Sequence, residues 1–146
     1  MPPKTLSLKC TDNKKVEFDT LMLAKYSILI GDMLDTTQTD EREVLNLPFY
    51  NITEPIMQKV KFYLLNFNDN AEYQVPITAQ NNTFESVFKS DQKIKEFFKS
   101  LSHEELHLLT DASNFMNIPK LLEGCKCAIA IYIKQAAIAY SKEALK

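Results

Sequence analysis

The sequence predicts an α+β fold, with a small sheet near the N-terminus packed against helices. Within residues 5–19, apolar and polar residues alternate in two short segments, the pattern of strands that bury one face. After residue 52, apolar residues recur at the spacing of a buried helix face. A chain of 146 residues is long enough to form one domain with a substantial core.

A hairpin begins the predicted fold. The segments "TLSLKC" and "VEFD" alternate, and the turn-rich "TDNKK" between them joins two antiparallel strands. Leu6, Leu8, Val16 and Phe18 then share one face of the hairpin. We expect this face to pack into the core.

Two short helices and a third strand follow. Residues 20–34 place apolar side chains near helical spacing, and Ser27 is a good N-cap that divides the segment into two helices. The segment "EVLNLPFYNI", residues 43–52, is typical of a strand, and Pro48 stops it. These elements give a predicted sheet of three strands.

The next helix begins at Thr53, which caps it, with Pro55 in the first turn. Its expected buried stripe is Ile56, Val60, Leu64 and Phe67. Residues 68–88 are polar, rich in Asn and without a sustained period, so we predict a long flexible loop.

The remainder of the chain is predicted to be helical. A short amphipathic helix covers 91–101, a second helix runs from Ser102 to about Met116, and a third runs from Pro119 to about Ile133. A last turn or two follows to the end of the sequence.

Composition limits the functions that the chain can have. The net charge is −2 and neither half of the chain is basic, so nothing favours nucleic acid as a partner. No apolar run is long enough to span a bilayer, and no signal peptide is apparent, so we expect no membrane partner. Three cysteines are too few for a disulfide framework, and a reducing compartment fits them best. We therefore expect a location in the cytoplasm or nucleus.

One short motif raises the question of an enzyme. His103, Glu104 and His107 fit the His-Glu-x-x-His spacing of zinc proteases. These are the only histidines in the chain, and a catalytic zinc normally takes three protein ligands. Ser102 and Glu105 explain the same letters as a capping box at a helix start. We therefore predict no metal, no cofactor and no catalytic residue.

The helix 119–133 is apolar on all sides, which indicates burial on all sides. Cys125 and Cys127 point about 200° apart on it, so they cannot hold one metal together and are interpreted as small buried residues. Two arrangements could cover the outer face. Either residues 133–146 fold back over it, or it is an exposed strip that receives a partner helix.

The order of these segments resembles the S-phase kinase-associated adaptor family. The string "LLTDASNFMNIPKLLEGCKCAIAIYI", residues 108–133, is similar to the family's Ala-Asn-aromatic element and the Leu-Leu-acidic helix after it. The segments "LSLKCTDNKKVEFD", "VLNLPFYNITEPIMQKVKFYLLNFND" and "DQKIKEFFKSL" match earlier parts of the family in the same order. The resemblance extends from about Lys4 to Ile133.

The resemblance implies a BTB/POZ fold, in which a small three-stranded sheet packs against helices, with added C-terminal helices. Residues 1–117 would form the BTB/POZ core, including the loop 68–88. Residues 118–146 would form a helical extension for an F-box partner, and family members usually continue with further helices beyond this segment. The central loop here lacks the strong acidity of the family's loop.

The resemblance also implies a function. Family members are adaptors without catalytic activity, which link a cullin scaffold to F-box substrate receptors in ubiquitin ligases. Asn114 and Phe115 match the family's Asn-aromatic pair and are expected to bind the N-terminal domain of a cullin. The expected contacts to the F-box are Ile129, Ile131, Tyr132 and Ile133.

Two alternatives share the same fold. The chain could be an adaptor like elongin C, a shorter relative that ends near the region of Asn117, or a structural subunit of another assembly that reuses the adaptor fold. Without its partner, we expect the exposed helix to allow a homodimer. The sequence does not name the cullin, the F-box protein or the substrates.

Overall fold

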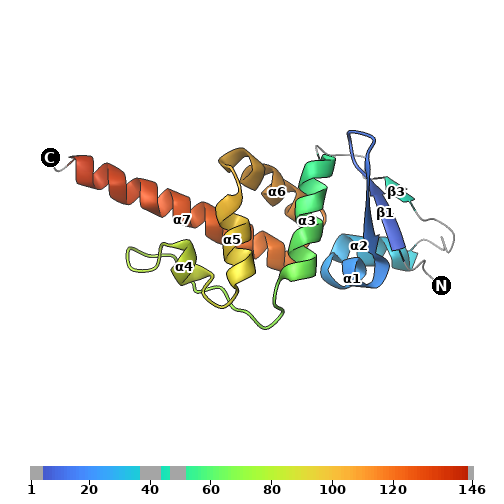
Figure 1. Ribbon diagram of the computed structural model, residues 1–146, viewed down its shortest axis with the longest axis horizontal. Coiled ribbons are helices and arrows are strands. Elements are labelled where there is room, and N and C mark those ends of the chain that lie inside the picture. Colours follow the sequence, from blue (N-terminus) through green and yellow to red (C-terminus); the bar gives the residue numbers. More distant parts are fainter. Residues whose placement is uncertain (1–4, 37–43, 47–51, 145–146) are drawn as a thin grey trace.

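The computed structural model of the chain describes residues 5–36, 44–46 and 52–144. Within these ranges a small sheet lies at one end of the molecule and helices form the rest (Figure 1). The elements are β1 (Thr5–Lys9), β2 (Lys15–Asp19), α1 (Thr20–Tyr26), α2 (Ile28–Thr36), β3 (Val44–Asn46), α3 (Glu54–Asn66), α4 (Phe84–Val87), α5 (Gln92–Ser100), α6 (His103–Phe115) and α7 (Pro119–Ala144). The fold is therefore α+β and mostly helical, as predicted.

The sheet has the strand order β2-β1-β3. β1 and β2 pair antiparallel, and this register places Leu6 opposite Phe18 and Leu8 opposite Val16. These four side chains are at most 1% exposed, which confirms the predicted buried face. β3 pairs with β1 in parallel. Residues 47–51 of the predicted third strand, including Pro48, lie outside the described residues.

Ser27 divides α1 from α2, as the sequence predicted. Its Oγ accepts a hydrogen bond from the backbone N–H of Ile30 at 3.2 Å, which caps the start of α2. The same hydroxyl donates to the carbonyl of Met116 at 2.6 Å. Because Met116 is the C-cap of α6, this side chain connects the N-terminal helices to the end of a helix far along the chain.

α3 begins after Thr53, with Pro55 in its first turn, as predicted. The Thr53 side chain makes no capping hydrogen bond, and the carboxylate of Asp12 instead accepts the N–H of Glu54 at 3.1 Å. The predicted stripe is buried at Ile56, Val60 and Leu64, whereas Phe67 follows the helix and packs against the core while partly buried.

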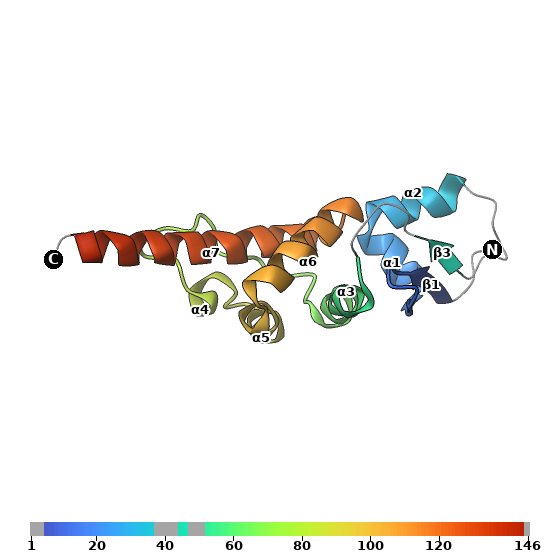
Figure 2. The same cartoon turned by 90° about the horizontal axis from the view of Figure 1, so that it is seen from above.

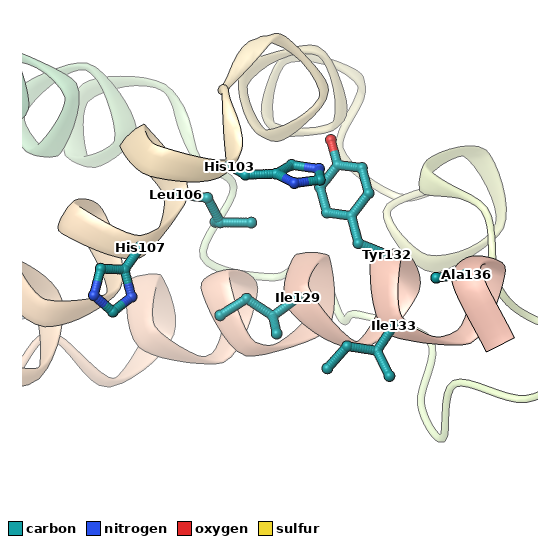
Figure 3. Close-up of a pocket in the computed structure, with 7 residues that line it drawn as sticks. All are labelled: His103, Leu106, His107, Ile129, Tyr132, Ile133 and Ala136. Atoms are coloured by element: carbon teal, nitrogen blue, oxygen red, sulfur yellow. The ribbon is translucent and has the colours of Figure 1, made fainter.

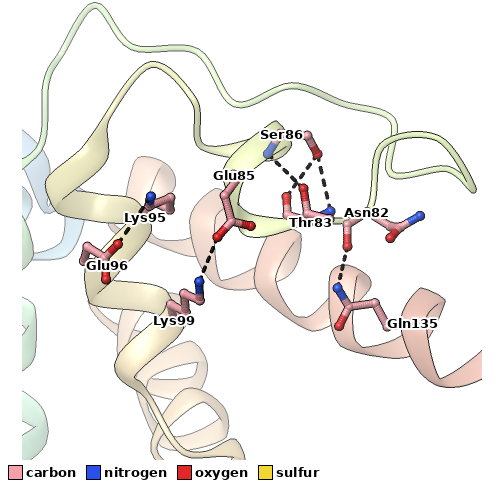
Figure 4. A network of polar contacts seen from close by, with 8 residues as sticks. All are labelled: Asn82, Thr83, Glu85, Ser86, Lys95, Glu96, Lys99 and Gln135. Carbon is pink, nitrogen blue, oxygen red and sulfur yellow. Dashed lines mark hydrogen bonds and ion pairs between the residues drawn. The ribbon is translucent and has the colours of Figure 1, made fainter.

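The predicted loop contains one feature that the sequence analysis missed, the short helix α4. Before it, Asn81 and Asn82 hold the chain by side-chain bonds to backbone carbonyls, such as Asn81 Nδ2 to Gln74 O at 2.6 Å. Figure 4 shows how this part of the chain is attached to its neighbours. Glu85 binds Lys99 of α5 at 2.7 Å, and Gln135 of α7 donates to the carbonyl of Asn82 at 2.8 Å. The flexibility of residues 68–88 remains a prediction.

α7 is a single helix of 26 residues that runs through Ala144, so the folded-back arrangement predicted for residues 133–146 is wrong. Residues 125–144 contain neither Gly nor Pro and include several alanines, which favours an unbroken helix. The helix follows the long axis of the molecule, and its C-terminal end projects beyond the other elements (Figures 1 and 2). The first half packs on α5 and α6, and the second half carries exposed side chains.

The close packing of α7 depends on Gly124. A Cβ at this position would lie 2.5 Å from Cζ of Phe98, a fully buried ring of α5. Beside it, the hydroxyls of Tyr63 and Tyr73 lie 2.5 Å apart, and Tyr63 also donates to the carbonyl of Lys120 at 3.2 Å. Glycine therefore allows α7 to approach α5 and the loop at this point.

The three cysteines are free and buried, which confirms the burial predicted for Cys125 and Cys127. Among the described helices, none combines the length and the apolar character that a bilayer span would need.

Candidate functional site

The candidate site is a groove between α6 and α7 that contains three of the four residues predicted to bind an F-box (Figure 3). Its volume is about 390 Å³. It is lined by His103, Leu106, His107, Ile129, Tyr132, Ile133 and Ala136. Apart from the two imidazoles and the phenol, these side chains are hydrocarbon, so the surface is suited to packing.

The α6 wall begins at a capping box, as predicted. The N–H of Glu105 donates to Ser102 Oγ at 3.1 Å, and the Glu105 carboxylate accepts the N–H of Ser102 at 2.9 Å. This backbone hydrogen bond lowers the pKa of Glu105, with a further contribution from Lys59 at 3.3 Å. The cap fixes the first turn of α6 and so positions His103 and His107 on the groove side.

The two histidines face different neighbours. The ring of His103 lies against that of Tyr132, with centroids 4.5 Å apart (Figure 3). Nε2 of His107 lies 3.5 Å from the carboxylate of Asp111. Within the described part of the chain, no group of three or more His, Cys, Asp or Glu side chains is placed to hold a metal ion.

The α7 wall is apolar and continues beyond the groove. Ile133 is 64% exposed and Tyr140 is 76% exposed, which is unusual for side chains of this size. Ile129, Ile133, Ala136 and Tyr140 follow one another at spacings of four, three and four residues, so they form one stripe along the helix. We call this stripe the α7 strip. It gives the groove a helical wall with room for a partner along it.

Ile131 has a different position from the other predicted F-box residues. It is 0% exposed and does not line the groove. Residues 131 and 133 are two apart and so lie about 200° apart around the helix axis, which places one in the core and the other at the surface. Tyr132 lies between these extremes. Its ring packs against His103 on one side and Phe84 of α4 on the other.

The two residues predicted to bind a cullin lie at the other end of α6. Asn114 is exposed, and Phe115 is partly buried and packs against the core. The helix ends beside them at Met116, and Asn117 follows with a φ of 51°, a left-handed conformation that Asn tolerates at a helix end. The N–H of Ile28 donates to the carbonyl of Asn117 at 2.9 Å, which fixes this end to the start of α2.

The two candidate surfaces lie toward opposite ends of α6. His107 of the groove and Asn114 are seven residues apart, about 10 Å along the helix axis, so a partner at each surface contacts different residues. A larger hollow of about 630 Å³ lies along α7 beside the loop residues Val75 and Ile77. None of the predicted binding residues lines that hollow.

Sequence reasoning missed several parts of the groove. Leu106, Ala136 and the two histidines were not predicted to line it, and Tyr140 was not predicted to extend it. The sequence shows the helical spacing of these residues. It does not show which face of α6 packs against which face of α7. Neither the protein-family models nor the curated proteins include a match to this chain.

Proposed function

We propose that the chain is a non-catalytic adaptor with a BTB/POZ fold, which links a cullin scaffold to an F-box substrate receptor in a ubiquitin ligase. The observation that carries this proposal is the apolar groove between α6 and α7, which the α7 strip extends. An F-box helix would cover Ile129, Ile133 and their neighbours. Such a role places the chain in the cytoplasm or nucleus.

The arrangement of the two surfaces supports this role. An adaptor must hold two partners on one rigid body, and α6 separates the groove from the surface at Asn114 and Phe115. Apart from the two imidazoles and the Tyr132 phenol, the groove lining offers only hydrocarbon to a partner, which favours binding over catalysis.

Two alternatives share the fold. An adaptor like elongin C would lack the helix after the region of Asn117, so the 26-residue α7 favours the first reading. A structural subunit of another assembly would use the same α7 strip for a partner that is not an F-box protein.

Calorimetric titration of the chain with an F-box peptide tests the groove. Ile133→Asp introduces a charge at a position that is 64% exposed, so folding is retained and F-box affinity falls by at least about tenfold. Cullin binding is unchanged in this variant. Leu21→Asp is the matched control, because Leu21 of α1 is 75% exposed and does not line the groove. We expect this variant to bind both partners as the wild type does.

The outcomes separate the alternatives. If Ile133→Asp does not change the affinity for the F-box peptide, the groove is not the F-box site. Cullin binding without F-box binding in the wild type would favour the elongin-like reading, and binding of neither partner would favour the structural subunit.

A further inference from the structure

A second groove lies on a different face, between α3 and α5. Its volume is about 420 Å³, and its lining includes Pro55, Lys59, Phe62, Lys93, Glu96 and Phe97. None of these residues lines the α6–α7 groove or belongs to the surface at Asn114 and Phe115. This groove is therefore independent of the proposed adaptor surfaces.

The apolar part of this groove is a pair of stacked rings. Phe62 of α3 and Phe97 of α5 lie nearly parallel, with centroids 5.5 Å apart and planes inclined by 16°. Phe97 is 7% exposed, but Phe62 is 46% exposed although it belongs to a helix whose other aromatic ring, Tyr63, is fully buried. An exposed ring stacked on a buried one provides a flat platform for an apolar side chain.

The charge around this platform is positive, although the whole chain is negative. α3 and α5 together carry five lysines and two glutamates, whereas the chain has a net charge of −2. Both glutamates already have partners, since Glu54 lies 3.9 Å from Lys14 and Glu96 lies 3.3 Å from Lys95. The acidic groups of these helices therefore do not repel an incoming carboxylate at full strength.

Two of the five lysines remain without an ion pair. Lys59, Lys95 and Lys99 bind Glu105, Glu96 and Glu85, respectively. Lys61 and Lys93 form no ion pair with another residue in the described ranges, and Lys93 lines the groove and is exposed. The network around Lys95 and Lys99 is visible in Figure 4. The groove thus combines an apolar platform with an unmatched positive charge.

We propose that the α3–α5 groove binds an acidic peptide segment of a partner protein, with one apolar side chain of the segment on Phe62 and its carboxylates near Lys93. The groove lies between two helices, and such surfaces accept linear segments. The charge complementarity selects acidic sequences and makes the affinity depend on salt.

Fluorescence anisotropy with three short labelled peptides tests the proposal on the full chain. In the first peptide, aspartates and glutamates flank one phenylalanine. The second replaces the phenylalanine with alanine, and the third replaces the acidic residues with lysine. We expect the first peptide to bind and the other two to bind at least about tenfold more weakly. Added salt is expected to lower the affinity for the first peptide. In a nitrogen-15 NMR titration, the shifted amides lie on α3 and α5.

Two variants with matched controls locate the site. Lys93→Glu reverses an exposed charge without affecting the core, and it weakens the first peptide by at least about tenfold. Lys142→Glu on α7 is its control and leaves the affinity unchanged. Phe62→Ala also weakens binding, and Leu65→Ala is its control because Leu65 is 59% exposed on the same helix and does not line the groove. Circular dichroism confirms that each variant is folded.

Four outcomes would contradict the proposed peptide site. The proposal is overturned if the acidic peptide does not bind, if Lys93→Glu and Lys142→Glu weaken it equally, or if the peptide with alanine binds as well as that with phenylalanine. A labelled single-stranded oligonucleotide that binds through the same lysines more tightly than the peptide would also overturn it.

Discussion

At the scale of single residues, Ser27 connects two helices that are far apart in the sequence. The side chain is fully buried, and its hydroxyl bonds to Ile30 at the start of α2 and to Met116 at the end of α6. A helix cap is a local feature, so the first bond was predictable from the sequence. The second joins residues 89 positions apart and depends on the fold.

Ser27→Ala is therefore expected to destabilise the fold by about 1 to 3 kcal/mol, because it removes a cap and a buried hydrogen bond together. Urea unfolding followed by circular dichroism measures the loss. Ser141→Ala, at an exposed position of α7, is the control and changes the stability little. A loss equal to that of the control would show that the Ser27 bonds contribute no stability.

Asn114 and Phe115 provide a residue-scale prediction for the cullin surface. Phe115→Ala removes the proposed aromatic anchor, so cullin affinity falls by at least about tenfold while F-box binding is retained. Because Phe115 also packs against the core, Asn114→Ala is the second variant, at an exposed position. Thermal melts check folding in both. Unchanged cullin affinity in both folded variants would remove this surface from the proposed interface.

At the scale of elements, the sequence predicted what short-range patterns determine. Alternation located β1 and β2, and the Ser102–Glu105 pair located the start of α6. α4 was missed because a helix of four residues is too short to show a period. The continuation of α7 to Ala144 was not predicted, although "QAAIAYSKEA" contains no residue that stops a helix. The apolar residues of this segment do not form a complete buried face, so the sequence pattern alone did not indicate a long helix.

The groove was predictable only in part for a similar reason. The resemblance grouped Ile129, Ile131, Tyr132 and Ile133 as F-box contacts. Helical spacing puts Ile131 about 200° from Ile133, but it does not show which of the two faces the core. That orientation depends on the helices against which α7 packs. The α6 wall with Leu106 and the histidines followed only from the three-dimensional arrangement.

Gly124→Ala tests the contact between α7 and α5. The added methyl group would meet the buried ring of Phe98, and overpacking of this kind costs about 1 to 3 kcal/mol. The better helix propensity of alanine offsets about 1 kcal/mol, so we expect a net loss of stability of up to about 2 kcal/mol. Chemical denaturation measures it, and a stabilised Gly124→Ala variant would mean that Phe98 can move away at little cost.

At the scale of the whole molecule, the buried thiols link stability to pH. Burial raises the pKa of Cys10 and Cys127 to about 11 and that of Cys125 to about 12, from an ordinary value of 9.0. Burial likewise raises the pKa of Tyr63 and Tyr73. The unfolded chain therefore loses these protons at a lower pH than the folded chain does.

The stability that these groups contribute is complete below pH 9 and falls as pH rises from about 9 toward 11. Unfolding midpoints measured across this range, under reducing conditions, are expected to decrease steadily. Cys127→Ala is a useful comparison because it removes one of the titrating thiols and should flatten the decrease. A midpoint that stays constant up to pH 11 would contradict the assignment of these thiols as buried and neutral.

We propose that the molecule holds two partners at once, one in the α6–α7 groove and one at the end of α6 that carries Asn114 and Phe115. The first measurement is size-exclusion chromatography with light scattering on the chain mixed with a cullin N-terminal domain and an F-box peptide. We expect a single ternary complex with one copy of each component, and we expect Ile133→Asp to lose the F-box peptide alone. If the two partners exclude one another, or if neither binds, the proposal is wrong.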